Sequence, residues 1–301
     1  MGKNSKDKRD IYYRKAKEEG WRARSAFKLL QLDEQFNFLA DAKRVVDLCA
    51  APGSWSQVLS RRLGAGASVS GGARIVAVDL QEMAPIDGVI QVRGDITKRT
   101  TAEQIIGLFE GELADVVVSD GAPDVTGMHD IDEYVQSQLI LAALNITTHL
   151  LRPGGTFVAK IFRGRDTTLL YNQFKLFFPF VTLAKPKSSR NSSIESFIVC
   201  QGYAPPPGYV PVMVDPALFH APHSSGVDED ASASLEQMLA GVNRRVVPFV
   251  ACGDLSGFDA DRSYDLEMEV DYQRKEVLQS PINPPYKRAK EMKREGLLDP
   301  N

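Results

Sequence analysis

Short apolar, β-branched runs alternate with helical segments between residues 44 and 203. This alternation constrains the fold most, because strands that are apolar throughout must be covered on both faces, as in a parallel sheet with helices on each side. It predicts an α/β fold with a doubly wound, mostly parallel sheet of seven strands. The expected strands are 44–49, 74–80, 88–95, 114–120, 154–162, 179–186 and 196–203, and the expected helices are 54–63, 99–110, 130–151 and 166–178.

The segments on either side of this alternation differ from it in composition. The N-terminal segment holds ten Lys or Arg, four Asp or Glu and four aromatic residues, a local net charge of +6 in a chain whose net charge is −3. Aromatic rings among cations can stack on bases while the cations contact phosphates, although a solvated tail is the alternative. We therefore predict a basic aromatic RNA-binding arm at 1–28, a catalytic domain at 29–203 and a C-terminal extension at 204–301 that wraps the domain or docks a partner.

Composition also narrows the class of protein. No run of about 18 apolar residues occurs, so we expect no membrane span. The start, MGKNSKDKRD, lacks the apolar core of a secretory signal. Three isolated cysteines, Cys49, Cys200 and Cys252, form no CxxC pair, so we expect no disulfide framework, no metal site and a reducing, cytoplasmic location.

Acidic residues lie at the carboxyl ends of the first three strands, where ligands bind in such sheets. They are Asp47, Asp79 and Asp95, and Gly53 in the first loop allows close approach of a ligand. The loop is not GxGxxG, so a phosphate-binding turn is missing. A pocket with three carboxylates suits a cationic nucleoside, and S-adenosylmethionine has a sulfonium, an ammonium and a ribose without phosphate. The alternative is that each Asp caps a helix or forms a turn.

Two further side chains at strand ends are candidates for catalysis. Asp120 ends the fourth strand and Lys160 ends the fifth, and these strands are expected to be neighbours that flank the first. A lysine in the apolar run FVAKIF costs free energy to bury unless it is paired, so a functional role is favoured over a structural ion pair. Glu195 begins the last strand.

Four sequence blocks resemble the FtsJ family of ribose 2′-O-methyltransferases: DLCAAPGSWSQ, SDGAPDVTG, VAKIFRG and KPKSSRNSSIESFIVC. The N-terminal YYRKAKEEGWRARSAFKL is similar to a further block of that family, except that Trp21 stands where Tyr is usual. The resemblance covers about residues 6–203 and implies a Rossmann-like class I methyltransferase. It implies a catalytic tetrad of Lys28, Asp120, Lys160 and Glu195, and cofactor contacts from Gly53, Trp55, Asp79, Asp95 and Asp120.

Within that family the chain resembles eukaryotic tRNA enzymes that methylate riboses 32 and 34 of the anticodon loop. The blocks FVACGDLSGFDADRSY and SPINPPY carry the resemblance into the C-terminal extension. It implies tRNA as the substrate and auxiliary protein subunits, including a WD-repeat protein. Ribosomal RNA, an mRNA cap, and a catalytically idle RNA-binding subunit remain the alternatives.

The resemblance leaves the role of Lys160 open. Nearby carboxylates favour its charged form, whereas burial and the second cation, Lys28, favour the neutral one. Lys160 either removes the proton of the ribose 2′-hydroxyl as a base or stays charged and steers the 2′-oxygen. RNA phosphates are expected to contact four arginines, Arg22, Arg24, Arg163 and Arg190.

Overall fold

The computed structural model describes residues 10–64, 73–123, 129–164, 167–213, 240–246 and 287–295. The chain forms two compact units, residues 1–253 and residues 254–301. The boundary predicted near residue 204 falls inside the first unit, and residues 1–9 of the predicted arm lie outside the described residues. The three predicted parts of the chain therefore stay predictions.

A seven-stranded sheet lies at the centre of the first unit and confirms the predicted fold class. Its order is β3-β2-β1-β4-β5-β7-β6, in which β7 is antiparallel to both of its neighbours and the other pairs are parallel. β4 and β5 are neighbours, as predicted, but they do not flank β1: β1 lies between β2 and β4. The strands are β1 (Arg44–Leu48), β2 (Arg74–Asp79), β3 (Val89–Arg93), β4 (Ala114–Ser119), β5 (Leu151–Phe162), β6 (Phe180–Ala184) and β7 (Glu195–Gln201).

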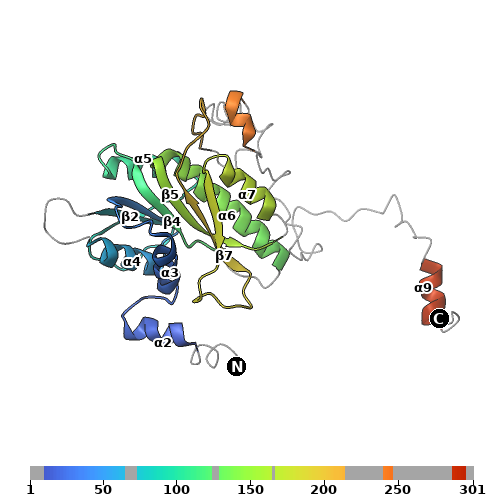
Figure 1. Ribbon diagram of the computed structural model, residues 1–301. Helices are drawn as coiled ribbons and strands as arrows, with labels where there is room; N and C mark the ends of the chain where they lie inside the picture. The colour runs from blue at the N-terminus through green and yellow to red at the C-terminus, as the bar shows by residue number, and fades with distance from the viewer. Residues whose placement is uncertain are drawn as a thin grey trace, which may run out of the picture. The chain divides into compact units, whose positions relative to one another are not determined.

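Helices cover both faces of this sheet (Figure 1). Because successive strand residues point to opposite faces, Val45 and Val116 are buried against one helical layer and Val46 and Val117 against the other. The first layer contains α3 (Ala26–Phe36) and α4 (Ser54–Leu63). The second contains α5 (Arg99–Leu108), α6 (His129–Leu150) and α7 (Thr167–Lys175). The four helices expected after residue 50 are thus present.

The N-terminal segment contains two helices that the sequence analysis did not predict. α2 (Ile11–Glu18) begins after Asp10, whose carboxylate accepts N–H groups of the first helical turn. α3 places Leu29 and Leu32 in the apolar core against α4 and the sheet. The C-terminal end of the predicted arm is therefore packed against the domain. The predicted boundary after residue 28 falls inside α3.

The chain after β7 continues along the first unit. The ring of Tyr209 packs edge-on against Phe177, with the ring centroids 4.9 Å apart. Asn243, in the 3-10 helix η2 (Gly241–Arg245), exchanges two hydrogen bonds with the backbone of Val210.

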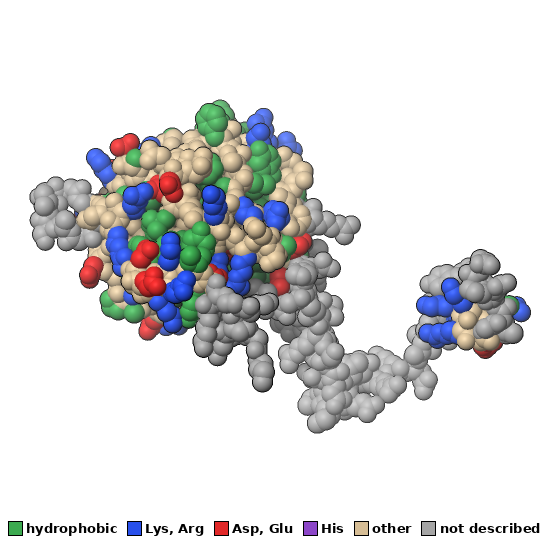
Figure 2. Space-filling view, turned by 60° about the horizontal axis from the view of Figure 1, so that its bottom comes forward, with side chains coloured by type: hydrophobic (Ala, Val, Ile, Leu, Met, Phe, Trp, Pro, Cys, Tyr) green, Lys and Arg blue, Asp and Glu red, His purple; other side chains and the backbone are tan. Residues whose placement is uncertain are grey.

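The second unit contains α9 (Lys287–Arg294), in which five of the eight residues are Lys or Arg (Figure 2). Among the described residues of the whole chain, none of the helices combines the length and the apolar character that crossing a membrane requires.

Candidate active site

The carboxyl edge of the sheet brings Lys160 and Asp120 into contact. Asp120 follows β4 directly, and Lys160 lies near the end of the neighbouring β5. The Nζ atom of Lys160 is 2.7 Å from Oδ1 of Asp120 and donates to the Asp120 carbonyl at 2.7 Å. The two side chains are 9% and 17% exposed, so the ion pair is largely shielded from water.

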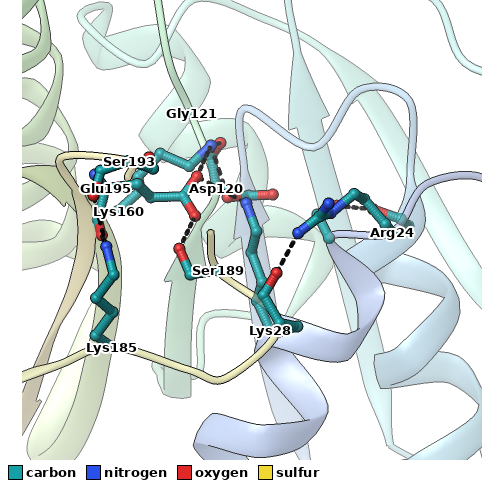
Figure 3. A network of polar contacts seen from close by, with 12 residues as sticks. Arg24, Lys28, Asp120, Gly121, Lys160, Lys185, Ser189, Ser193 and Glu195 are labelled. Atoms are coloured by element: carbon teal, nitrogen blue, oxygen red, sulfur yellow. Dashed lines mark hydrogen bonds and ion pairs between the residues drawn. The ribbon is translucent and has the colours of Figure 1, made fainter. Parts of the chain in front are cut away.

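Glu195 joins this pair because β7 runs in the opposite direction to β5. Its first residue therefore lies at the edge where β5 ends, with Glu195 opposite Phe162. Oε2 of Glu195 is 2.7 Å from Nζ of Lys28, which comes from α3, and 3.9 Å from Nζ of Lys160. The four residues of the predicted tetrad thus form one chain of ion pairs, Lys28–Glu195–Lys160–Asp120 (Figure 3).

The charge of Glu195 is set by the two lysines. Burial alone would raise the pKa of this carboxyl, because it penalises the charged form. Lys28 and Lys160, together with hydrogen bonds from Lys28 and Ser189, outweigh burial and hold the pKa of Glu195 below its ordinary value. Glu195 is therefore ionised at neutral pH and offsets the positive charge of both lysines.

The segment between β6 and β7 holds Glu195 in position. Ser189 Oγ donates to Glu195 Oε1 at 2.6 Å. Lys185 Nζ donates to the carbonyls of Ser193 and Glu195, at 2.6 Å and 2.9 Å (Figure 3). No role for Ser189 is predicted from the sequence, because one serine in a serine-rich loop carries no signal of its own.

A cavity of about 1000 Å³ adjoins the ion-pair chain. Lys160 and Asp120 line it, together with Asp79 and Asp95. Asp79 accepts two backbone N–H groups, each at 2.8 Å, and Asp95 accepts the N–H and the hydroxyl of Thr97. Such bonds to nearby backbone N–H groups are those of a residue that forms a turn, which was the alternative prediction for each Asp. They also hold both carboxylates at the wall of the cavity, so the two roles are compatible.

The prediction that Asp47 lies on the rim of this cavity is wrong. Asp47 lies within β1, and its side chain is fully buried, where Oδ2 accepts a hydrogen bond from Ser56 Oγ at 2.5 Å. Because side chains alternate along a strand, Asp47 points beneath α4, on the side of Val45. Burial, with smaller contributions from nearby Asp120 and Asp79, raises the pKa of Asp47 to about 7.

This raised pKa predicts a specific dependence of stability on pH. Between pH 3.8, the ordinary pKa of an Asp side chain, and about pH 7, Asp47 is protonated in the folded chain and ionised in the unfolded chain. The folded state then binds one more proton, so rising pH removes stability from the wild type but not from Asp47→Asn. The wild type should lose about 1.4 kcal/mol per pH unit relative to the variant between about pH 5 and 7, and no more above that.

Urea unfolding of both proteins at four pH values from 5 to 8 measures this difference. Asp41→Asn, at an exposed position, controls for the loss of one carboxylate. A free-energy gap between wild type and Asp47→Asn that stays constant with pH would refute the assignment.

Gly53 and Trp55, which the family resemblance places at the cofactor, have different surroundings. Gly53 has a φ of +98°, and a Cβ at this position would lie 2.7 Å from a guanidinium nitrogen of Arg22 and 2.8 Å from the Ile86 side chain. Trp55 is buried in the core, and its indole N–H donates to the Ser25 carbonyl at 3.0 Å. Neither is among the residues that line the cavity, so their contacts with a cofactor stay predictions.

The four predicted RNA-contacting arginines differ in their surroundings. Arg22 lines the cavity and donates to three backbone carbonyls. Arg24 and Arg190 both form ion pairs with Asp10, and Arg163 donates to a carbonyl at 3.4 Å. Arg163 and Arg190 are exposed. Lys and Arg side chains are spread among acidic and apolar ones on the face that carries α2 (Figure 2).

Comparison with known proteins gives matches over most of the chain. A family model described as FtsJ-like methyltransferase matches residues 21–203. A Mus musculus protein named tRNA (cytidine(32)/guanosine(34)-2'-O)-methyltransferase is 59% identical over 300 residues, which cover 99% of this chain and 88% of that protein. A Schizosaccharomyces pombe protein of the same name is 54% identical over 302 residues, covering 99% of this chain and all of that protein.

Among solved structures, one of a putative ribosomal RNA methyltransferase from Plasmodium falciparum is similar in fold. It is 27% identical, with a TM-score of 0.55, and covers 62% of this chain and 100% of that chain. The similarity to the two tRNA enzymes thus reaches further than this structural match and extends past residue 203, where the family model ends.

Proposed function

This chain belongs to the FtsJ-like methyltransferase family, and we propose that it transfers a methyl group from S-adenosylmethionine to ribose 2′-oxygens of tRNA, at nucleotides 32 and 34 of the anticodon loop. The observation that carries the proposal is Lys160, which is buried, paired with Asp120 and Glu195, and lines the wall of the large cavity. One group of side chains can therefore contact both a cofactor and an acceptor oxygen.

The cavity suits the proposed cofactor. Its volume lies at the upper end of the roughly 300–1,000 Å³ common for small-molecule sites. Asp79, Asp95 and Asp120 present carboxylates to it, which attract a cation and can accept hydrogen bonds from a ribose and an amine. When bound, S-adenosylmethionine supplies a methyl group on a positively charged sulfur.

The ion-pair chain would act on the acceptor. Both roles predicted for Lys160 place Nζ close to the ribose 2′-oxygen, either to take its proton or to stabilise the charge that develops on it. Two oxygens of Asp120 and one of Glu195 surround Nζ. All three are acceptors, and the Asp120 carbonyl accepts a hydrogen bond from Nζ, which supports the role in which Lys160 steers the ribose oxygen.

Binding of tRNA would depend on basic side chains at the same edge of the domain. Arg163 and Arg190 are exposed there, beside the segment that holds Glu195. We propose that they contact phosphates. Such contacts provide affinity rather than sequence choice. Selection of nucleotides 32 and 34 would then need loop shape and auxiliary subunits, including the WD-repeat protein that the family resemblance implies. A cytoplasmic location fits the free thiols of Cys49 and Cys200.

Three purified RNAs distinguish this function from its alternatives: tRNA, a ribosomal RNA fragment and a capped RNA. Each is incubated with the protein and radiolabelled S-adenosylmethionine, with and without cell extract to supply subunits. We expect label in tRNA, at nucleotides 32 and 34. Label confined to the ribosomal or capped RNA would favour those acceptors, and RNA binding with neither cofactor binding nor transfer would indicate an idle subunit.

A further inference from the structure

We propose that Gln136 is a positioning residue for methyl transfer, which fixes the spacing between the strand ends that carry Asp120 and Lys160. The inference rests on the proposed function and adds a residue to its site. Gln136 lies on α6, outside the ion-pair chain, and its side chain is buried, with the residue 2% exposed.

The hydrogen-bonded ladder between β4 and β5 stops just before the catalytic residues. Its last pair is Ser119 with Ala159, one residue before Asp120 and Lys160 on their strands. Beyond that pair, the side-chain amide of Gln136 bridges the two chain segments where the next backbone hydrogen bond of the sheet would otherwise lie. Its Nε2 atom donates to the carbonyl of Gly121 at 3.2 Å and to the carbonyl of Lys160 at 3.0 Å. An amide NH₂ has two hydrogens, so one nitrogen can satisfy both carbonyls.

This bridge acts on both members of the Lys160–Asp120 pair through the backbone. Lys160 Nζ donates to the carbonyl of Asp120 (Figure 3). Gln136 donates to the next carbonyl along the chain, that of Gly121. Gly121 has little room to shift, because a Cβ there would lie 2.9 Å from Cys49 and 3.1 Å from Leu139. The peptide that follows Asp120 is thus fixed from two sides.

Removing the amide should therefore misplace Lys160 relative to Asp120 without removing either side chain. Displacements of about 1 Å can cost on the order of 100-fold in rate. A purely structural role would instead reduce stability and leave the turnover of the folded protein unchanged.

The test compares Gln136→Met with Asn145→Leu, at the other end of α6. Asn145 is a matched control, because its side-chain amide donates to a backbone carbonyl, that of Val212, outside the ion-pair chain. Thermal unfolding, cofactor binding, and kcat and KM for tRNA are measured under the conditions in which wild type methylates tRNA. We expect kcat to fall about 10- to 100-fold in Gln136→Met, with KM and cofactor affinity within about threefold of wild type. Asn145→Leu should keep kcat within about twofold.

Gln136→Leu, which is also apolar and lacks the donor, should show the same fall in kcat and replaces the Met variant if that variant does not fold. Wild-type kcat in folded Gln136 variants, or an equal fall in Asn145→Leu, would overturn the inference. A different result would refute the proposed function itself: no methyl transfer by wild type, or equal transfer by Lys160→Met.

Discussion

Lys160→Met is expected to lower the single-turnover rate of methyl transfer by about 10³-fold, while affinity for S-adenosylmethionine stays within about threefold of wild type. Met keeps the length of the side chain but removes the group that both proposed roles need at the 2′-oxygen. Lys160 already contacts Asp120 and Glu195, so its Nζ is placed before substrate binds. Such prior placement is what makes an electrostatic contact effective in a reaction.

Lys175→Met is the matched control, because Lys175 is an exposed lysine on α7, and its rate should stay at the wild-type value. Near-wild-type activity of Lys160→Met would refute both proposed roles. The pH dependence of the wild-type rate separates them. A rate that rises with pH supports a base that must first lose a proton, and a flat profile from about pH 6 to 9 supports the steering role.

Glu195→Gln is expected to destabilise the fold by about 3 kcal/mol and to lower the transfer rate by about 100-fold. The substitution keeps the shape of the side chain but leaves Lys28 and Lys160, which are 11% and 9% exposed, without the shared carboxylate. Because the folded pKa of Glu195 is lowered, the wild-type advantage is present above the ordinary pKa of 4.5 and is lost as pH falls below it. Urea unfolding at pH 7 and single-turnover kinetics measure both effects.

Glu110→Gln breaks a matched but exposed ion pair, Arg74–Glu110, whose side chains are 44% and 74% exposed. Its effect on stability should stay within about 0.5 kcal/mol. Lys28→Met combined with Glu195→Gln should cost less than the sum of the two single changes, because both remove the same contact. Strict additivity, or a Glu195→Gln variant as stable as the Glu110→Gln control, would contradict the shared role of this carboxylate.

The sheet could be predicted from sequence because its strands other than the edge strands β3 and β6 are mostly buried on both faces and are therefore largely apolar. α2 and α3 were missed for the opposite reason. Their cations drew attention to a basic arm, although Leu29 and Leu32, at helical spacing, already marked a buried face. Charge density in a segment does not exclude helix, and one apolar stripe is enough to dock it.

The candidate site could be predicted only in part. Asp120 and Lys160 follow from their positions at strand ends, whereas Glu195 reaches the same edge because β7 is antiparallel, a reversal that its own residues do not reveal. Asp47 was misplaced because one position along a strand separates a buried side chain from one at the edge. Gln136 could not be found from sequence, since its role depends on where the ladder between β4 and β5 ends.

In the proposed reaction, this ion-pair chain directs a methyl group to the ribose 2′-oxygens of tRNA nucleotides 32 and 34. The most direct test uses tRNA in which these two nucleotides alone carry 2′-deoxyribose, compared with all-ribose tRNA of the same sequence, in the presence of radiolabelled S-adenosylmethionine. The 2′-hydroxyls at these two positions are then the only difference between the substrates. We expect label in the all-ribose tRNA and background counts in the deoxy tRNA. Equal labelling of the two would contradict it, because the acceptor would then be another atom.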